Sequence, residues 1–249
     1  VTKVTAPKTW SVNGVGRTGA HLVSQISGAP AFGGTPADFA VVQAIQELKA
    51  RGYRVTFYPF LLMDVPEGNA LPDPYSDNAA AIGQPQYPWR GLINCSPAAG
   101  YALTVDKSTS SAAQVDAFFG SAQGSDYAVS GTSVTWTGGV DWGYRRMVLH
   151  YAKLCAAAGG VDAFLIGSEL RGLTQIRSST STYPAVAKLK VLAGAVSSTL
   201  GSGVKVGYAA DWSEYFGHHP QDGSGDVFFH LDPLWADSNI DFVGIDNYM

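Results

Sequence analysis

With 249 residues, the chain is long enough for one large domain with a sizeable core, or for two small domains. Its formal net charge of −4, with no basic cluster larger than Arg145 and Arg146, excludes the positive surface that nucleic-acid or membrane binding requires. No apolar run reaches the roughly 18 residues of a membrane span, and the first residues lack the apolar core of a signal peptide. The start without Met and the end directly after a strand-like run lead us to expect a slice of a longer protein.

The first 34 residues are rich in Gly, Ser and Thr, so we expect an irregular lead-in at 1–34 ahead of one domain at 35–249. A short strand is expected at 20–24. The segment from Gly14 to Gly19 matches G-x-G-x-x-G, but a dinucleotide site needs a strand before this motif and a helix after it. Glycine and proline follow instead, so we interpret the motif as a turn and expect no cofactor.

A helix is expected to begin near Thr35, which can cap it, with Pro36 in its first turn and Asp38 adding a favourable charge. Its inward face is expected to contain Phe39, Val42, Ile45 and Leu48. Gly52 should end this helix, and a strand is expected at 53–60.

Residues 64–140 are expected to form a long loop insertion, dense in Pro, Gly, Asn and Asp over its first part. Loops of this length in a compact domain are commonly functional. Within it we expect a short helix at 111–120 and a small hairpin around 133–136.

After the insertion, helical and strand-like patterns alternate. The expected elements are a helix at 141–158, a strand at 163–167, a helix at 183–200, and strands at 204–208 and 240–246. Such alternation is typical of parallel β/α units, which predicts an α/β fold. Together with the strand at 53–60 it gives four core strands, whereas a complete (β/α)8 barrel has eight.

Acidic residues follow the strands of this predicted sheet. Glu169 comes after the strand at 163–167, Asp211 and Glu214 after the next strand, and Asp246 at the end of the last. In a barrel of parallel strands such residues converge on one cleft, and glycoside hydrolysis needs two carboxyl groups there. The alternatives are structural: an ion pair of Glu169 with Arg171 or Arg146, a helix-cap contact for Glu169, or a helix cap for Asp246.

Sugar binding also requires flat aromatic faces beside polar groups, and several aromatic residues lie in or next to presumed loops. The candidates for substrate binding are Trp89, Trp142, Trp212, Tyr215, Trp235 and Tyr248, of which core packing is expected to take about half.

Metal chemistry and nucleophilic catalysis have no comparable support. His218, His219, Asp222, Asp226 and His230 match no established zinc spacing, so we expect a solvated loop and no metal site. Cys95 and Cys155 are expected to be two buried thiols, with a disulfide between them as the alternative. No G-x-S-x-G elbow is present, so the sequence does not point to a serine nucleophile.

Six stretches together carry a family resemblance. They are 53–64, 142–154, 164–172, 209–218, 229–235 and 244–249. These stretches closely resemble the glycoside-hydrolase-like TIM-barrel domain of gene transfer agent and phage tail-tip (baseplate) proteins, from about residue 19 onward. The resemblance implies a (β/α)8 fold, only partly contained in this chain, within a trimeric tail-tip protein that contacts other baseplate subunits of the particle. It also implies that the strand before Glu169 is the fourth, where this clan of glycosidases carries its acid/base glutamate.

Two departures from the clan pattern leave the function open. Ser168 stands where the clan usually has Asn, and the nucleophile glutamate of strand seven is missing, so Asp246 or Asp211 would have to supply the second carboxylate. The leading hypothesis is a tail-tip domain that binds, and as an enzyme hydrolyses, a cell-envelope glycan such as peptidoglycan, with Glu169 as general acid. The alternative is a non-catalytic carbohydrate-binding or structural barrel. An ordinary secreted or cytoplasmic glycosidase is disfavoured.

Overall fold

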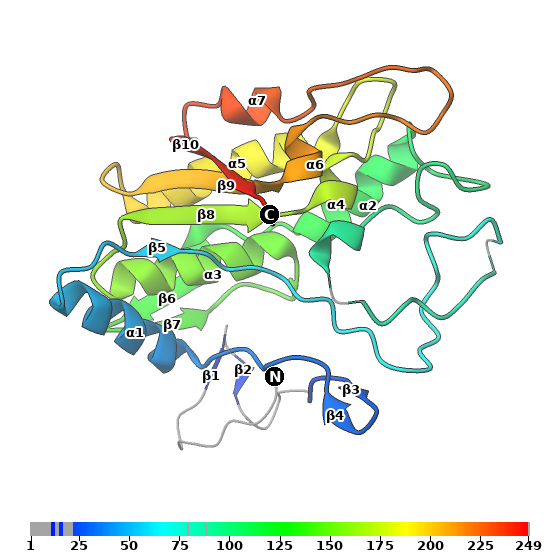
Figure 1. Ribbon diagram of the computed structural model, residues 1–249. Coiled ribbons are helices and arrows are strands. Elements are labelled where there is room, and N and C mark those ends of the chain that lie inside the picture. Colours follow the sequence, from blue (N-terminus) through cyan, green and yellow to red (C-terminus); the bar gives the residue numbers. More distant parts are fainter. Residues whose placement is uncertain (1–10, 13–14, 17–21, 79, 88, 249) are drawn as a thin grey trace.

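The computed structural model describes residues 11–12, 15–16, 22–78, 80–87 and 89–248 (Figure 1). Near the start lie two short hairpins, β1 (Ser11–Val12) with β2 (Val15–Gly16), and β3 (Gln25–Ile26) with β4 (Ala29–Pro30). The strand expected at 20–24 is wrong over 22–24, since these residues belong to no strand and β3 begins at Gln25. Gly14 and Gly19 of the glycine motif lie outside the described residues.

A four-stranded parallel sheet, in the order β10-β9-β8-β5, forms the centre of the molecule. Its strands are β5 (Thr56–Phe57), β8 (Ala163–Ser168), β9 (Lys205–Asp211) and β10 (Phe242–Asp246). This confirms the α/β class and the four expected core strands. The strand expected at 53–60 is shorter than predicted, because only Thr56 and Phe57 pair with β8.

Helices α3 (Tyr144–Ala157) and α5 (Pro184–Leu200) lie side by side, and α5 contacts both β8 and β9 (Figure 1). The inward face of α3 follows the helical period, and Val148 and Cys155 on it are fully buried. Phe164 of β8 is also fully buried and stacks on Phe57 of β5 at 5.7 Å between ring centroids. The core therefore sits between the sheet and these helices.

Helix α1 (Asp38–Ala50) packs against α3, but with a different face from the one expected. Val41, Val42 and Ile45 are buried, whereas Phe39 and Leu48 are exposed. The shift has a polar cause, since Asp38 is buried and accepts a contact of 2.9 Å from His150 Nε2 of α3. Residue 37, not Thr35, takes the cap position, and no side chain caps the helix.

The long insertion contains the predicted helix and hairpin. They are α2 (Thr109–Phe119) and the pair β6 (Tyr127–Ser130) and β7 (Ser133–Trp136), with short 3₁₀ turns at Arg90–Leu92 and Gly124–Asp126. Before α2 the insertion runs beyond the carboxyl ends of the strands (Figure 1). Cys95 and Cys155 are both free and buried, which confirms the expectation for them. Among the described residues, no helix has the length and apolar character needed to cross a membrane.

The sheet is curved. Ser168 Oγ on β8 lies 2.8 Å from Asp246 Oδ2 on β10, although β9 runs between these strands. Second-neighbour strands of a flat sheet are roughly 9–10 Å apart and their side chains point in parallel, so such a contact requires curvature towards this face. We call this the concave face. Polar side chains at the carboxyl ends of alternate strands therefore meet on it, as in a barrel.

Candidate functional site

Glu169 follows β8 directly and adopts a left-handed backbone conformation, with φ of 47°. Its backbone N–H donates to the carbonyl of Ala209 at 2.8 Å, which fixes the turn to β9. For a residue other than glycine this conformation costs about 1–2 kcal/mol. The side chain is only 2% exposed. Strain of this kind, held at the carboxyl end of a strand, gathers at functional sites, so the geometry favours Glu169 as a site residue.

Three side chains hold the carboxylate of Glu169. Trp89 Nε1–H donates to Oε2 at 2.6 Å, Arg90 Nη2 lies 3.1 Å from the same oxygen, and the hydroxyl of Tyr248 donates to Oε1. Glu169 therefore forms its ion pair with Arg90. The expectation of an ion pair with Arg171 or Arg146 is wrong. Of the aromatic residues expected at the site, Trp89 and Tyr248 touch its carboxylate directly.

Arg90 also organises the neighbouring Ser168. Its Nε donates to the carbonyl of Ser168 at 2.8 Å and its Nη2 donates to Ser168 Oγ at 2.6 Å. The guanidinium lies over the ring of Phe60, 4.8 Å from the centroid, which adds a cation–π contact. Sequence reasoning did not consider Arg90, since it lies in the middle of the long insertion. Its position next to Trp89 was the available signal.

Asp246 is the second carboxylate of this cluster. Its Oδ2 accepts from Ser168 Oγ at 2.8 Å and from the hydroxyl of Tyr58, just after β5, at 2.7 Å. Burial, together with the adjacent Asp246, raises the pKa of Tyr58 to about 12, so Tyr58 remains a neutral donor. Arg90 Nη2 contacts both Glu169 and Ser168 Oγ, and Ser168 Oγ contacts Asp246, so the structure brings Glu169 together with Asp246, one of the two residues expected as its partner.

Asp211 has the contacts of a helix cap. Its Oδ1 accepts from the N–H of Ser213 at 2.9 Å at the start of α6 (Trp212–Tyr215), and Glu214 completes a capping box. A catalytic role for Asp211 stays a prediction, with these cap contacts as its structural alternative.

Glu214 is fully buried and accepts hydrogen bonds at both carboxylate oxygens. Oε1 accepts from Thr174 Oγ1 at 2.6 Å and from the hydroxyl of Tyr208 at 2.8 Å, and Oε2 accepts from the N–H of Asp211 at 3.2 Å. Burial is the largest influence on this group and raises the pKa of Glu214 to about 7, well above the ordinary value of 4.5. Sequence reasoning gave this residue less weight than Asp211, because burial cannot be read from its spacing.

The raised pKa of Glu214 predicts a pH-dependent stability. The unfolded state ionises near pH 4.5 and the folded state near 7, so the contribution of Glu214 is full below the first value and is lost as pH rises through the second. Between pH 5 and 8 we expect the wild type to lose about 2.5 kcal/mol of unfolding free energy that Glu214→Gln does not lose. Urea unfolding of both proteins at the two pH values measures this difference.

The comparison with Glu214→Gln is needed because two histidines act in the opposite direction. Burial lowers the pKa of His218 to about 4 and that of His230 to about 3, so their contributions are lost as pH falls below about 6.5. Both proteins share this trend, so it cancels in the difference. Equal changes in the two proteins would contradict the expectation for Glu214.

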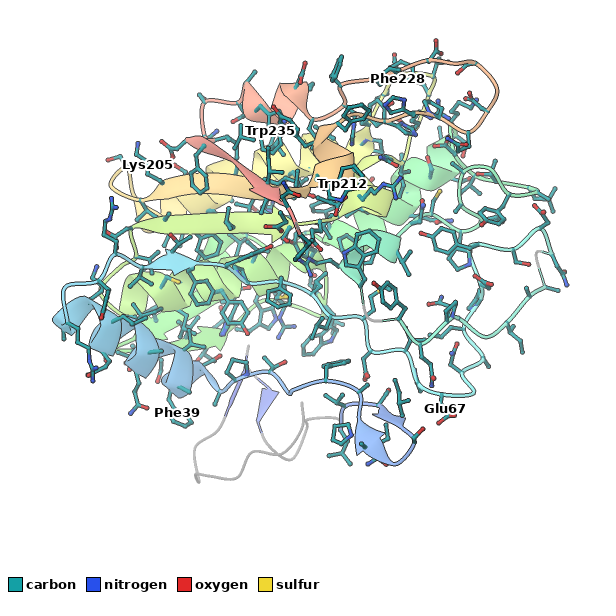
Figure 2. All side chains as sticks on the ribbon, in the orientation of Figure 1. Phe39, Glu67, Lys205, Trp212, Phe228 and Trp235 are labelled. Atoms are coloured by element: carbon teal, nitrogen blue, oxygen red, sulfur yellow. The ribbon has the colours of Figure 1, made fainter. Side chains whose placement is uncertain are left out.

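The other candidate aromatic residues are distributed over several elements. Trp212 and Tyr215 are exposed on α6, and Trp142 is exposed over Arg146, 3.9 Å from ring centroid to guanidinium carbon. Trp235 on α7 (Asp232–Trp235) is partly buried against the core, near Tyr208 (Figure 2). Core packing therefore takes fewer of these rings than expected. A role of Trp142, Trp212, Tyr215 and Trp235 in substrate binding stays a prediction.

The histidine segment is solvated at 221–227, as expected, but the expectation is wrong for its two ends, His218 and His230. His218 and His230 are buried and their rings pack on Tyr183, whose hydroxyl lies 2.9 Å from His218 Nδ1. His219 and Asp226 are exposed. Within the described part of the chain, no three His, Cys, Asp or Glu side chains are placed to hold a metal ion.

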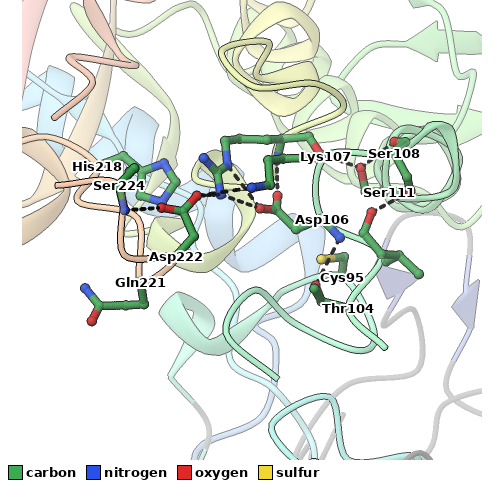
Figure 3. A network of polar contacts seen from close by, with 12 residues as sticks. Cys95, Thr104, Asp106, Lys107, Ser108, Ser111, His218, Gln221, Asp222 and Ser224 are labelled. Carbon is green, nitrogen blue, oxygen red and sulfur yellow. Dashed lines mark hydrogen bonds and ion pairs between the residues drawn. The ribbon is translucent and has the colours of Figure 1, made fainter. Parts of the chain in front are cut away.

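Ion pairs tie this segment to the long insertion (Figure 3). Arg177, which is 2% exposed, donates to Asp106 Oδ2 from Nε at 3.0 Å and from Nη2 at 2.7 Å. Arg177 Nη2 also lies 3.2 Å from Asp222 Oδ2, and Lys107 reaches the same oxygen at 3.1 Å. These contacts hold two loops together at the end of the molecule that carries Glu169.

Comparison with known proteins supports the resemblance to the gene transfer agent domain over the second part of the chain. Residues 142–249 match the family described as the GTA TIM-barrel-like domain, where GTA stands for gene transfer agent. The matched region includes β8, β9 and β10 with Glu169, Asp211 and Asp246, whereas Tyr58, Trp89 and Arg90 precede it. No curated protein matches the chain. This part of the chain is therefore similar to the TIM-barrel-like domain of gene transfer agents.

Proposed function

We propose that this chain is a tail-tip (baseplate) domain of a gene transfer agent or phage-like particle that binds and hydrolyses a cell-envelope glycan such as peptidoglycan. It would form part of a barrel in a larger protein, trimeric around the tail axis and in contact with other baseplate subunits. The match of residues 142–249 supports a particle component. The observation that carries the chemistry is the buried, left-handed Glu169 joined through Ser168 and Arg90 to Asp246.

In the proposed reaction Glu169 is the general acid. Its carboxyl proton would pass to the glycosidic oxygen as the bond to the anomeric carbon breaks, which produces an oxocarbenium-like transition state. Asp246 would stabilise this positive charge and, as water adds to the anomeric carbon, take the proton that the water gives up, with Tyr58 and Ser168 orienting its carboxylate. Trp89 and Tyr248, which contact Glu169, would line the sugar subsite with their rings.

The second candidate is a barrel that recognises glycan without cleaving it. Both oxygens of Glu169 accept from protein donors, and Arg90 provides a positive partner at 3.1 Å, so the side chain is already held by this chain's own residues. The aromatic residues would then bind sugar rings, and Glu169 would accept hydrogen bonds from sugar hydroxyls.

One experiment separates these functions. Purified peptidoglycan is incubated with the protein, soluble reducing sugar is measured over time, and the protein that sediments with the insoluble glycan is measured in the same samples. Release of sugar supports the hydrolase. Binding without release supports the recognition barrel, and neither binding nor release contradicts both. Heat-denatured protein serves as the control for non-specific sedimentation.

A further inference from the structure

The residue after Glu169 is held by the hydroxyl of Tyr208 and by the backbone N–H of Thr174. Leu170, the next residue, donates its backbone N–H to the hydroxyl of Tyr208 at 2.9 Å. Thr174 ends the short helix α4 (Arg171–Thr174) that follows, and its backbone N–H donates to the carbonyl of Leu170 at 2.8 Å. Tyr208 and Thr174 each have one hydroxyl proton to donate in turn.

Both protons go to the same acceptor, Glu214 Oε1, from Tyr208 at 2.8 Å and from Thr174 at 2.6 Å. The other oxygen, Oε2, accepts from the N–H of Asp211 at the end of β9. One buried carboxylate thus connects the Glu169 turn, helix α4 and the end of β9. The proposed reaction makes no chemical use of Glu214, which is fully enclosed.

We propose that Glu214 is a positioning residue for Glu169, acting through Tyr208 and Thr174. A left-handed backbone at a non-glycine residue persists only where its surroundings fix it, and these bonds fix the residue after Glu169 and the helix beyond it. The expected effect on catalysis rests on the proposed function. The role of Glu214 in holding the Glu169 turn does not depend on it.

The charge on Glu214 should control how firmly the turn is held. An ionised carboxylate accepts all three hydrogen bonds, but a protonated one needs an acceptor for its own proton and gives up at least one. The polar groups around it are Tyr208 of β9, Thr174 of α4, Asp211 at the cap of α6, and His230, whose Nε2 lies 3.3 Å from Thr174 Oγ1. His219 and Asp232 line the same cavity as Glu214 and are exposed.

Since burial raises the pKa of Glu214 to about 7, the turn should loosen as pH falls through that value. His230 stays neutral over the same range, because burial lowers its pKa to about 3. The inference therefore predicts a pH-dependent position of Glu169 with an inflection near 7 that disappears when Glu214 can no longer titrate.

The test uses the wild type with Tyr208→Phe and Glu214→Gln, and Tyr127→Phe as the matched control. Tyr127 is also a buried tyrosine, but its hydroxyl donates to the backbone of Arg146 in α3, away from the Glu169 turn. The first measurement is the indole N–H resonance of Trp89, assigned with Trp89→Phe, because this proton reports on Glu169 directly. The second is kcat and KM for peptidoglycan from pH 5 to 9.

We expect the Trp89 resonance to shift in Tyr208→Phe and Glu214→Gln but not in Tyr127→Phe, and to titrate near pH 7 in the wild type and not in Glu214→Gln. We expect kcat to fall about tenfold to a hundredfold with KM unchanged in Tyr208→Phe, as for a misplaced catalytic group. A Trp89 resonance that is unchanged in both variants overturns the inference. A wild type that releases no sugar contradicts the proposed hydrolysis alone, and the resonance still decides the role of Glu214.

Discussion

Replacing Glu169 by Gln should lower the release of sugar from peptidoglycan by about 10²- to 10⁴-fold, the range that general acid catalysis contributes. The amide has nearly the shape of the carboxyl group but carries no acidic proton for the leaving oxygen. It can still accept from Trp89 or Tyr248, so the turn and the binding of glycan should persist. Rates of sugar release and the sedimented fraction of protein, measured on the same glycan, test both parts.

Glu47→Gln is the matched control for this substitution. Glu47 is exposed on α1 and pairs with Arg51 one turn further along, so the change should leave both rate and binding as in the wild type. If Glu169→Gln releases sugar at the wild-type rate, Glu169 is not the acid. If its binding is lost as well as its activity, the variant reports a recognition role and not a catalytic one.

A large loss of stability is expected for Arg177→Met. The substitution keeps most of the buried volume but leaves the enclosed carboxylate of Asp106 without its cation and without two of its hydrogen bonds. Removing one partner of a buried ion pair costs about 3–5 kcal/mol. The free energy of unfolding in urea, measured at neutral pH, should fall by this amount.

Arg51→Met provides the comparison, since the pair of Arg51 with Glu47 is exposed and is expected to contribute less than about 1 kcal/mol. Equal losses in the two variants would mean that Arg177 contributes no more than a surface charge. The double variant Asp106→Asn with Arg177→Met should recover part of the loss, because no unpaired carboxylate remains.

The sequence predicted the elements whose patterns are local. The helical period of α3 and α5 and the apolar run of β8 identify those elements and their buried faces, because each pattern depends on neighbouring residues only. The inward face of α1 was predicted less well. Its orientation depends on the buried contact of Asp38 with His150, which lies far along the chain.

The part of the candidate site that could be predicted from the sequence is the set of acidic residues at the carboxyl ends of the strands. Glu169 could be placed at one edge of the sheet with Asp246 and Asp211, because parallel strands have their carboxyl ends together, but the choice between these two as the second carboxylate stayed open. Arg90 could not be predicted as a site residue, because its contact with Glu169 depends on how a long irregular loop folds back over the sheet. The buried state of His218 and His230 was missed for the same reason, since their contacts with Tyr183 bridge distant segments.

The contacts of Glu169 also bear on where this protein can be divided. The region of family similarity begins at residue 142, yet Tyr58, Trp89 and Arg90 come from the part before it. A fragment cut at that point would keep the acidic residues but lose their cation, and β8 would lose its pairing with β5. The region of sequence similarity is thus smaller than the part of the chain that forms the site. Truncation experiments should therefore keep residues 142–249 joined to the part before them.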